Sequence, residues 1–159
     1  MGEDKVAKYE ELSEQLSDIY DERDDLEKST KHFGIELIKG LIIYLDYEPD
    51  KLTFSKPDPD CSDSMMLWES IELQPDNYWH FNIQMKIEHK DKMKWLSMCY
   101  DLGIKPKGNK FILGMFNIDG NINKEFLIDL NNEEERTAFY DHMYSLLKEG
   151  VTDFKYPIE

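Results

Sequence analysis

The spacing of apolar residues changes after about residue 33. In the first 33 residues, six apolar side chains lie three, four or seven positions apart. They are Tyr9, Leu12, Leu16, Ile19, Leu26 and Phe33. With Tyr9 at heptad position a, these residues fill a and d positions, and the polar residues Arg23 and Thr30 fill the other two a positions. Two apolar residues in seven form the narrow seam of a coiled coil, whereas a helix that packs on a domain has a wider apolar face.

Residues 1–33 are therefore predicted to form a coiled-coil stem. The segment from 3 to 33 has no proline and is rich in helix-forming residues, and 30 residues would form a rod of about 45 Å. Arg23 would lower the stability of the seam but could select the register or the partner. The expected dimerisation residues are Tyr9, Leu12, Leu16, Ile19, Arg23, Leu26 and Phe33. Homodimer and heterodimer both remain open, and the alternative is an amphipathic helix that packs on its own domain.

The pattern predicts a change to β-structure after the stem. Gly34 is expected to end the helix. The β-branched and aromatic run at 41–47 predicts a strand, residues 35–39 fit either helix or strand, and 51–55 could form a short second strand. A polar loop with two prolines follows.

The middle of the chain predicts an antiparallel meander. Alternation is clearest at 78–88, where Phe81, Ile83 and Met85 point to one face. Asp119-Gly120 between two apolar stretches is a strong hairpin signal. The other expected strands cover 65–73, 93–101, 110–117 and a segment that ends near Leu130.

The last 30 residues predict a helix that covers the sheet. Asn131 or Asn132 would cap it, and three glutamates in its first turn suit the helix dipole. Its expected end is Gly150, and its apolar face comprises Ala138, Phe139, Met143, Leu146 and Leu147. The predicted fold is thus α+β, with a stem (1–33), a globular domain of five to six strands and a helix (34–150), and a tail (151–159).

The charge of the chain narrows the range of partners. The formal net charge is −15, and residues 1–30 hold 11 acidic and 4 basic side chains. This charge argues against direct binding to nucleic acid. No apolar run is long enough to cross a membrane, and no signal peptide is expected. Two cysteines are too few for a disulfide framework, which indicates an intracellular location.

No enzyme site and no cofactor is predicted. The four histidines have no metal-ligand spacing. The segment from Asp58 to Glu69 resembles a calcium loop, but Asp63 replaces the glycine that such loops require. Cys99 lies in an apolar strand without an activating neighbour, so we expect a buried thiol.

Methionine and aromatic residues are unusually frequent in the predicted strands. If one helix covers only one face of the sheet, some of them point outward and form a protein-binding patch. The alternative is that they are core residues. The residues are Met65, Met66, Trp68, Tyr78, Trp79, Met93, Trp95, Met98, Met115 and Phe116.

Three stretches resemble the coiled-coil RWD proteins of kinetochores. Residues 33–37 (FGIEL) look like the junction of stem and domain, 124–130 (KEFLIDL) like the last strand, and 138–147 (AFYDHMYSLL) like the closing helix. Two groups are similar in the order of elements: the monopolin core subunit of fungi and the small globular-ended subunits of the outer kinetochore rod. The resemblance implies a nuclear adaptor that crosslinks kinetochore components in chromosome segregation.

We therefore expect a non-enzymatic, dimeric interaction protein. It would form a homodimer, or a heterodimer, through its stem and would bind other proteins through its globular domain. The alternative is an acidic inhibitor or immunity-type protein that blocks a basic site on another macromolecule.

Overall fold

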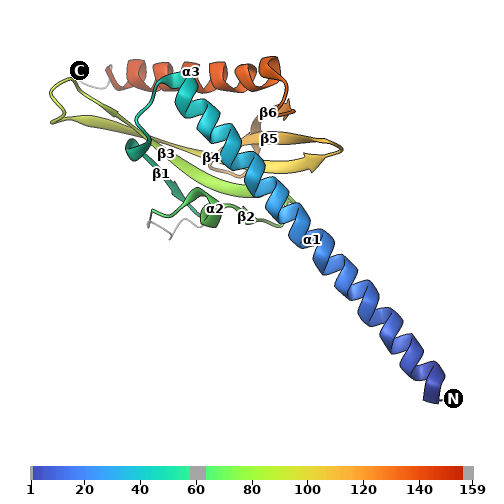
Figure 1. Ribbon diagram of the computed structural model, residues 1–159. Coiled ribbons are helices and arrows are strands. Elements are labelled where there is room, and N and C mark those ends of the chain that lie inside the picture. Colours follow the sequence, from blue (N-terminus) through green and yellow to red (C-terminus); the bar gives the residue numbers. More distant parts are fainter. Residues whose placement is uncertain (1, 58–63, 156–159) are drawn as a thin grey trace.

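The computed structural model describes residues 2–57 and 64–155, and it has the predicted α+β class (Figure 1). A long helix, α1 (Gly2–Leu45), precedes an antiparallel sheet, and a second long helix, α3 (Glu133–Lys155), ends the described chain. The sheet contains β1 (Leu52–Ser55), β2 (Glu72–Leu73), β3 (Trp79–Glu88), β4 (Trp95–Lys107), β5 (Lys110–Phe116) and β6 (Ile122–Ile128). Two short helices, η1 (Pro49–Lys51) and α2 (Leu67–Ser70), lie in the connections.

Helix α1 does not end at Gly34, and the strand predicted at 41–47 is wrong. The helix continues to Leu45, where Asp46 adopts a φ of 50°. The Asp46 N–H donates to Ile43 O and the Tyr47 N–H donates to Ile42 O, which is a Schellman ending. Packing explains the difference, because Leu37, Ile38 and Leu41 are buried against the sheet, and tertiary contacts override the strand preference of β-branched residues.

The predicted meander is confirmed for β3 to β6. The strand order is β1-β3-β4-β5-β6, and β2 pairs with β3 on the same side as β1. The hairpin at Asp119-Gly120 is confirmed, with a φ of 84° at Gly120. One prediction is wrong, because residues 65–73 form a bridge, the helix α2 and the two-residue strand β2 in place of one strand. Strand β4 is also longer than predicted and continues through Pro106 to its turn at Gly108.

Helix α3 begins as predicted but does not end at Gly150. The Asn132 side chain accepts a hydrogen bond from the Glu135 N–H at 3.2 Å, so Asn132 is the cap. The helix continues through Gly150 to Lys155. A side chain at Gly150 would collide with the sulfur of Met98, so this glycine lets α3 lie close to β4. Within the expected apolar face, Phe139, Met143 and Leu147 are buried, whereas Ala138 is exposed.

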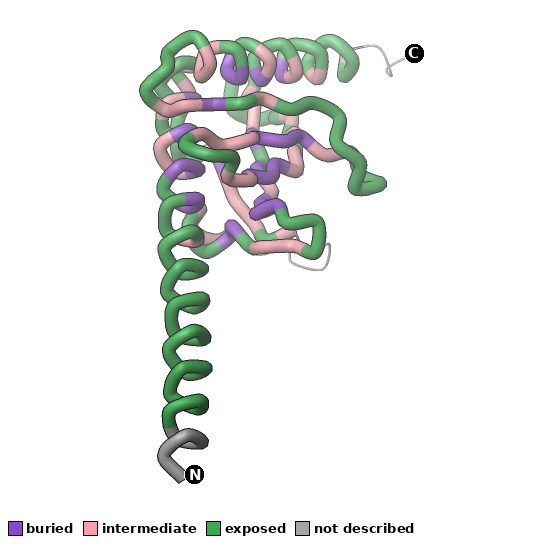
Figure 2. The backbone as a smooth tube through the Cα atoms, turned by 90° about the vertical axis from the view of Figure 1, so that its right-hand side faces the viewer, coloured by how far each residue is buried: buried purple, intermediate pink, exposed green. Residues whose placement is uncertain are grey.

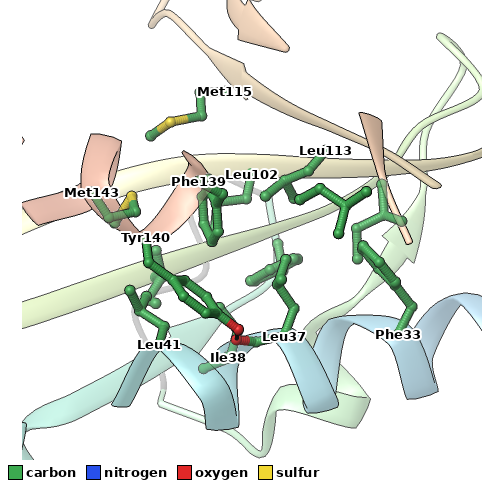
Figure 3. Packing of buried hydrophobic residues seen from close by; sticks show 14 of the residues in the cluster. Phe33, Leu37, Ile38, Leu41, Leu102, Leu113, Met115, Phe139, Tyr140 and Met143 are labelled. Atoms are coloured by element: carbon green, nitrogen blue, oxygen red, sulfur yellow. Dashed lines mark hydrogen bonds between the residues drawn. The ribbon is translucent and has the colours of Figure 1, made fainter. Parts of the chain in front are cut away.

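Both long helices pack on the same face of the sheet. Figure 3 shows Phe33, Leu37 and Leu41 of α1 opposite strand residues, with Phe139 and Met143 of α3 beside them. Phe33 stacks on Phe111 with ring centroids 4.3 Å apart. Full burial of such a side chain contributes roughly 1.5–3 kcal/mol. Within residues 2–57 and 64–155, no helix lies over the other face of the sheet, which we call the open face (Figure 1).

The two helices touch where Gly40 of α1 meets Tyr140 of α3. The Tyr140 hydroxyl donates a hydrogen bond to Leu37 O at 2.9 Å. A side chain at Gly40 would collide with that hydroxyl. Gly40 is therefore present in the middle of the helix because the two helices approach closely, although glycine weakens a helix interior by about 1 kcal/mol.

Candidate functional site

The lower part of α1 extends beyond the domain (Figure 2). It carries an exposed apolar stripe at heptad spacing. Residues 7–26 are exposed without exception. Tyr9, Leu12, Leu16 and Ile19 expose 73%, 64%, 55% and 61% of their surfaces, and Leu26 exposes 43%. An isolated helix with such a narrow stripe gains little from its own domain, so this stripe is the clearest candidate for a binding surface.

The same heptad positions change from exposed to buried along a single helix. Thr30, Phe33 and Leu37 continue the a and d positions of the stripe, and each is at most 1% exposed. Phe33 corrects the predicted set of dimerisation residues, because it belongs to the core of the domain and cannot contact a partner helix. The stripe therefore lies on the side of α1 that faces its own domain.

Arg23 lies at the lower edge of the domain. It lines a cleft of about 370 Å³ together with Glu27 and Lys31 of α1 and with Lys56 and Glu69 of the domain. Lys31 forms an ion pair with Glu27 at 3.2 Å and lies over the Trp68 ring. The cleft carries both signs of charge, and it marks the level at which the stem meets the domain.

The acidic residues of the stem mostly avoid the stripe. With Tyr9 at position a, the outer positions b, c and f carry most of the stem's acidic residues. Among residues 7–29, the e and g positions that flank the seam carry only three charges, those of Lys8, Glu22 and Glu27. A partner helix on this side would therefore meet little of the negative charge. The acidic outer residues are Glu10, Glu11, Glu14, Asp18, Asp21, Asp24 and Asp25.

A second polar feature lies on the open face of the sheet. His80 is 6% exposed, and its two ring nitrogens face two carboxylates: Nδ1 is 3.0 Å from Asp101 and Nε2 is 2.7 Å from Asp76. A neutral imidazole has one N–H, so only the protonated ring donates to both. Burial by itself lowers the pKa of His80, but the two carboxylate bonds outweigh it and raise the pKa above the ordinary value.

Aromatic rings surround this histidine. Phe116 lies beside His80, with ring centroids 4.4 Å apart, and Tyr78 lies edge-on to Phe116. Burial and a hydrogen bond to Glu125 raise the pKa of Tyr78 to about 12. Side chains at Gly103 and Gly114 would press on the Phe116 ring, so the two glycines let that ring lie on the strands. The group forms a small cluster of hydrogen-bonded and stacked side chains.

Sequence analysis missed the His80 cluster. Asp76 and His80 are four residues apart across a turn, but Asp101 reaches them only because β4 pairs with β3. The sequence offers one signal: in the alternating pattern of their strands, His80 and Asp101 each occupy a position on the polar side. Without the register of the two strands, that signal does not bring them together.

The methionine and aromatic residues divide between core and surface. Tyr78, Trp79 and Met115 are buried, as the core alternative expected. Met66, Trp68, Met93 and Trp95 are exposed, but only Trp95 of these four lies in a strand. The exposed residues lie at two separate places, near α2 and at the β3–β4 hairpin, so they form no single patch.

An apolar groove separates the β3–β4 hairpin from the end of α3. Its volume is about 550 Å³. Trp95, Ile87 and Leu96 line it on the sheet side, and Val151 and Phe154 line it on the helix side. A neighbouring groove of about 380 Å³ shares Ile87 and Val151. The two grooves adjoin each other and are lined mainly by apolar surface.

The described residues offer little for catalysis or metal binding. Over 2–57 and 64–155, no three His, Cys, Asp or Glu side chains converge as metal ligands. Cys99 is exposed, in contrast to the buried thiol that was predicted. The calcium-like segment from Asp58 onward, with Cys61, lies mostly outside the described residues. No helix in the described ranges is long and apolar enough to cross a membrane.

The remaining histidines are separate from one another. His32 is exposed, and His89 pairs with Asp91 at 2.9 Å within its turn. His142 lies near Phe126, and its buried Nε2 has no hydrogen-bond partner among the described residues. Burial and the nearby Lys124 lower the pKa of His142. None of these histidines shares a site with another.

Comparisons with known proteins give no relative. No family model, no curated protein and no solved structure matches the chain.

Proposed function

We propose that this protein is a non-enzymatic adaptor that forms a dimer through its N-terminal stem and binds other proteins through its globular domain. The observation that carries the proposal is the apolar stripe of Tyr9, Leu12, Leu16 and Ile19, which lies on the part of α1 that extends away from the domain (Figure 2). Four large apolar side chains at seam spacing, each more than half exposed, are typical of a helix that pairs with another helix.

The distribution of charge supports an adaptor over an acidic inhibitor. An inhibitor that covers a basic site needs carboxylates spread over its folded face. The acidic residues are densest on the outer side of the stem, whereas the open face of the sheet carries both signs, including Lys86, Asp101, Lys105 and Glu125. Such a surface suits specific protein contacts better than general attraction to a polycation.

The domain also offers a second surface, which an adaptor requires. The groove between the β3–β4 hairpin and α3 is apolar, and Trp95 and Phe154 are more than half exposed at its rim. Aromatic residues of this kind are frequent in the centres of protein interfaces. The groove and the stripe lie on different parts of the molecule, so a dimer leaves two copies of the groove free.

The resemblance to coiled-coil RWD proteins suggests where such an adaptor would act. It supports a nuclear, kinetochore-associated role in chromosome segregation as the proposed setting. The support comes from the order of the elements and from three short stretches of sequence.

The test of the dimer is the solution mass of the full chain by light scattering over a concentration series. We expect a dimer for the wild type and a folded monomer for Leu16→Glu, because the substitution buries a charge in the seam. Ser17→Glu is the matched control: it adds the same charge on the outer side of the same turn and should remain dimeric. A wild-type monomer at every concentration would refute the homodimer.

A further inference from the structure

The stem's apolar stripe points toward the space below its own domain, and this limits how a second copy can bind. The a and d positions that are exposed up to Leu26 are buried by the domain from Thr30 to Leu37. Since α1 is a single helix to Leu45, a parallel partner would continue upward along those positions. Its helix would have to occupy the place of the first copy's sheet, and its domain would collide with the first domain.

From this geometry we infer that the stems pair in antiparallel orientation, with position 14 of each copy at the centre of the pair. The inference rests on the proposed dimer and specifies the partner and its direction. Tyr9 of one copy would lie opposite Ile19 of the other, and Leu12 opposite Leu16. Each helix would begin near position 26 of its partner, at the level of the cleft that Arg23 and Glu27 line at the lower edge of the domain.

The spacing of the stripe fits this pairing. Tyr9, Leu12, Leu16 and Ile19 are separated by three, four and three residues, and this series is the same in both directions. Two antiparallel copies therefore match all four residues with apolar partners. A register one heptad further along would place Arg23 opposite Leu12 and would press the partner's first residues against the domain.

Charge favours the same arrangement. In antiparallel coils, g positions lie near g positions of the partner, so Lys8 would face Glu22 of the second copy twice in the dimer. In a parallel coil, g positions face e positions five residues further along. Glu22 would then face Glu27, and Arg23 would face Arg23. The antiparallel register thus gains two attractive Lys8–Glu22 contacts, although Arg23 then lies opposite Lys5 of the second copy. The parallel coil gives the Glu22–Glu27 repulsion twice and one Arg23–Arg23 contact.

An antiparallel stem places the two domains at opposite ends of the molecule. Position 30 of one copy lies about 50 Å along the axis from position 30 of the other, at 1.5 Å per residue. The two domains, and with them the two apolar grooves, would point to opposite ends of a rod. That geometry suits a protein that connects two separate binding partners.

Disulfide exchange between marked chains tests the direction. In a background with Cys61→Ser and Cys99→Ser, a mass-tagged Tyr9→Cys chain is mixed with an Ile19→Cys chain in a glutathione buffer. We expect a disulfide between the two variants and no disulfide within either variant alone. Disulfides within each variant alone would show a parallel coil and overturn the inference, and so would the absence of all disulfides in a solution of dimers. Glu14→Cys, on the outer side, is the control that neither arrangement links.

A charge exchange gives a second, milder test that leaves the seam intact. Glu22→Lys should weaken the dimer about threefold to tenfold relative to Asp21→Lys, which changes the same charge on the outer side. Adding Lys8→Glu to Glu22→Lys should restore the affinity. A parallel coil predicts the opposite sign, because Lys at position 22 would then face Glu27. The dissociation constants come from sedimentation equilibrium at low salt.

The outcomes separate this inference from the proposed function. A wild-type chain that stays monomeric refutes both. A dimer whose variants give self-links, or whose Glu22→Lys form binds more tightly, refutes the antiparallel orientation and leaves the dimeric adaptor standing.

Discussion

The lower and upper parts of helix α1 carry the same heptad stripe but have different surroundings. From Tyr9 to Leu26 the stripe is exposed, and from Thr30 to Leu41 it is buried against the sheet (Figure 2). In the upper part, positions next to the stripe are also apolar, so the apolar face is wider. This face comprises Phe33, Leu37, Ile38 and Leu41. The comparison shows that a wider apolar face packs on the domain, whereas the narrow seam is left for another partner.

The two parts of α1 also differ in where they contain glycine. The lower part has none between residues 3 and 33, and the upper part has Gly34 and Gly40. Gly34 lies against Ile104 and Ile71, and Gly40 against Tyr140. The glycines therefore mark the places where α1 approaches other elements, and neither of them ends the helix.

The largest expected difference comes from truncating one residue in each part. Phe33→Ala should lower the free energy of unfolding by about 3–5 kcal/mol, because it leaves a cavity beside Phe111. Leu12→Ala should change it by less than about 0.5 kcal/mol in dilute solution, where the stem is monomeric. Urea unfolding followed by circular dichroism measures both. Equal losses would mean that the stem folds back on its domain.

A smaller effect is expected where α1 meets α3. Gly40→Ala should destabilise the protein by about 1–3 kcal/mol, since its new methyl group collides with the Tyr140 hydroxyl. Adding Tyr140→Phe removes that hydroxyl and should recover part of the loss. Lys39→Ala, next to it on the exposed side, serves as the control. A stabilised Gly40→Ala would show that helix propensity outweighs the close approach.

The pH dependence of stability compares the buried His80 with the partly buried His142. The folded pKa of His80 is raised, so its contribution is complete below the ordinary pKa of about 6.5 and is lost as the pH rises through the higher folded value. The folded pKa of His142 is lowered, so its contribution is present above about 6.5 and is lost as the pH falls through the lower folded value.

The free energy of unfolding, measured from pH 5 to 9, should therefore change in a different pH range for each variant. His80→Gln should reduce the loss of stability that occurs as the pH rises through the folded pKa of His80, because Asp76 and Asp101 no longer have a charged partner. His142→Gln should reduce the loss of stability that occurs as the pH falls through the folded pKa of His142. A profile on which His80→Gln has no effect above neutral pH would show that the ring is not protonated between its carboxylates.

The smallest effect concerns the cap of α3. Asn132→Ala should cost about 1 kcal/mol, because Asn132 accepts the Glu135 N–H. Asn131→Ala should have almost no effect, since its side chain makes no capping bond in the described structure. Thermal unfolding of the two variants side by side decides between the two candidates that the sequence leaves open. Equal shifts would contradict the assignment.

Most of the sheet could be predicted because its signals are local. Alternation in β3 and the Asp119-Gly120 turn each depend on a few neighbouring residues. The errors fall where contacts from distant parts of the chain decide the conformation. Residues 41–45 are helical because α1 packs on the sheet, and Gly150 lies inside α3 at a place where a side chain would collide with Met98.

The candidate site divides in the same way. The stripe from Tyr9 to Ile19 is a periodic pattern within one helix, so its residues are found without any coordinates. Phe33 fits that pattern equally well, yet it belongs to the core, and periodicity cannot separate the two because both require apolar residues at the same spacing. The His80 cluster joins a turn to a neighbouring strand, so it needs the register of β3 and β4.

The sequence alone therefore determined the long N-terminal helix, the antiparallel sheet, the closing helix and the apolar seam, because each of these is encoded by spacing within a short segment. Only the tertiary structure decided where α1 ends, which part of its stripe is free and on which side of the helix the domain lies. Those features depend on contacts between residues far apart in the chain, such as Phe33 with Phe111 and Gly40 with Tyr140. The direction proposed for the dimer follows from the position of the domain, and no local pattern contains it.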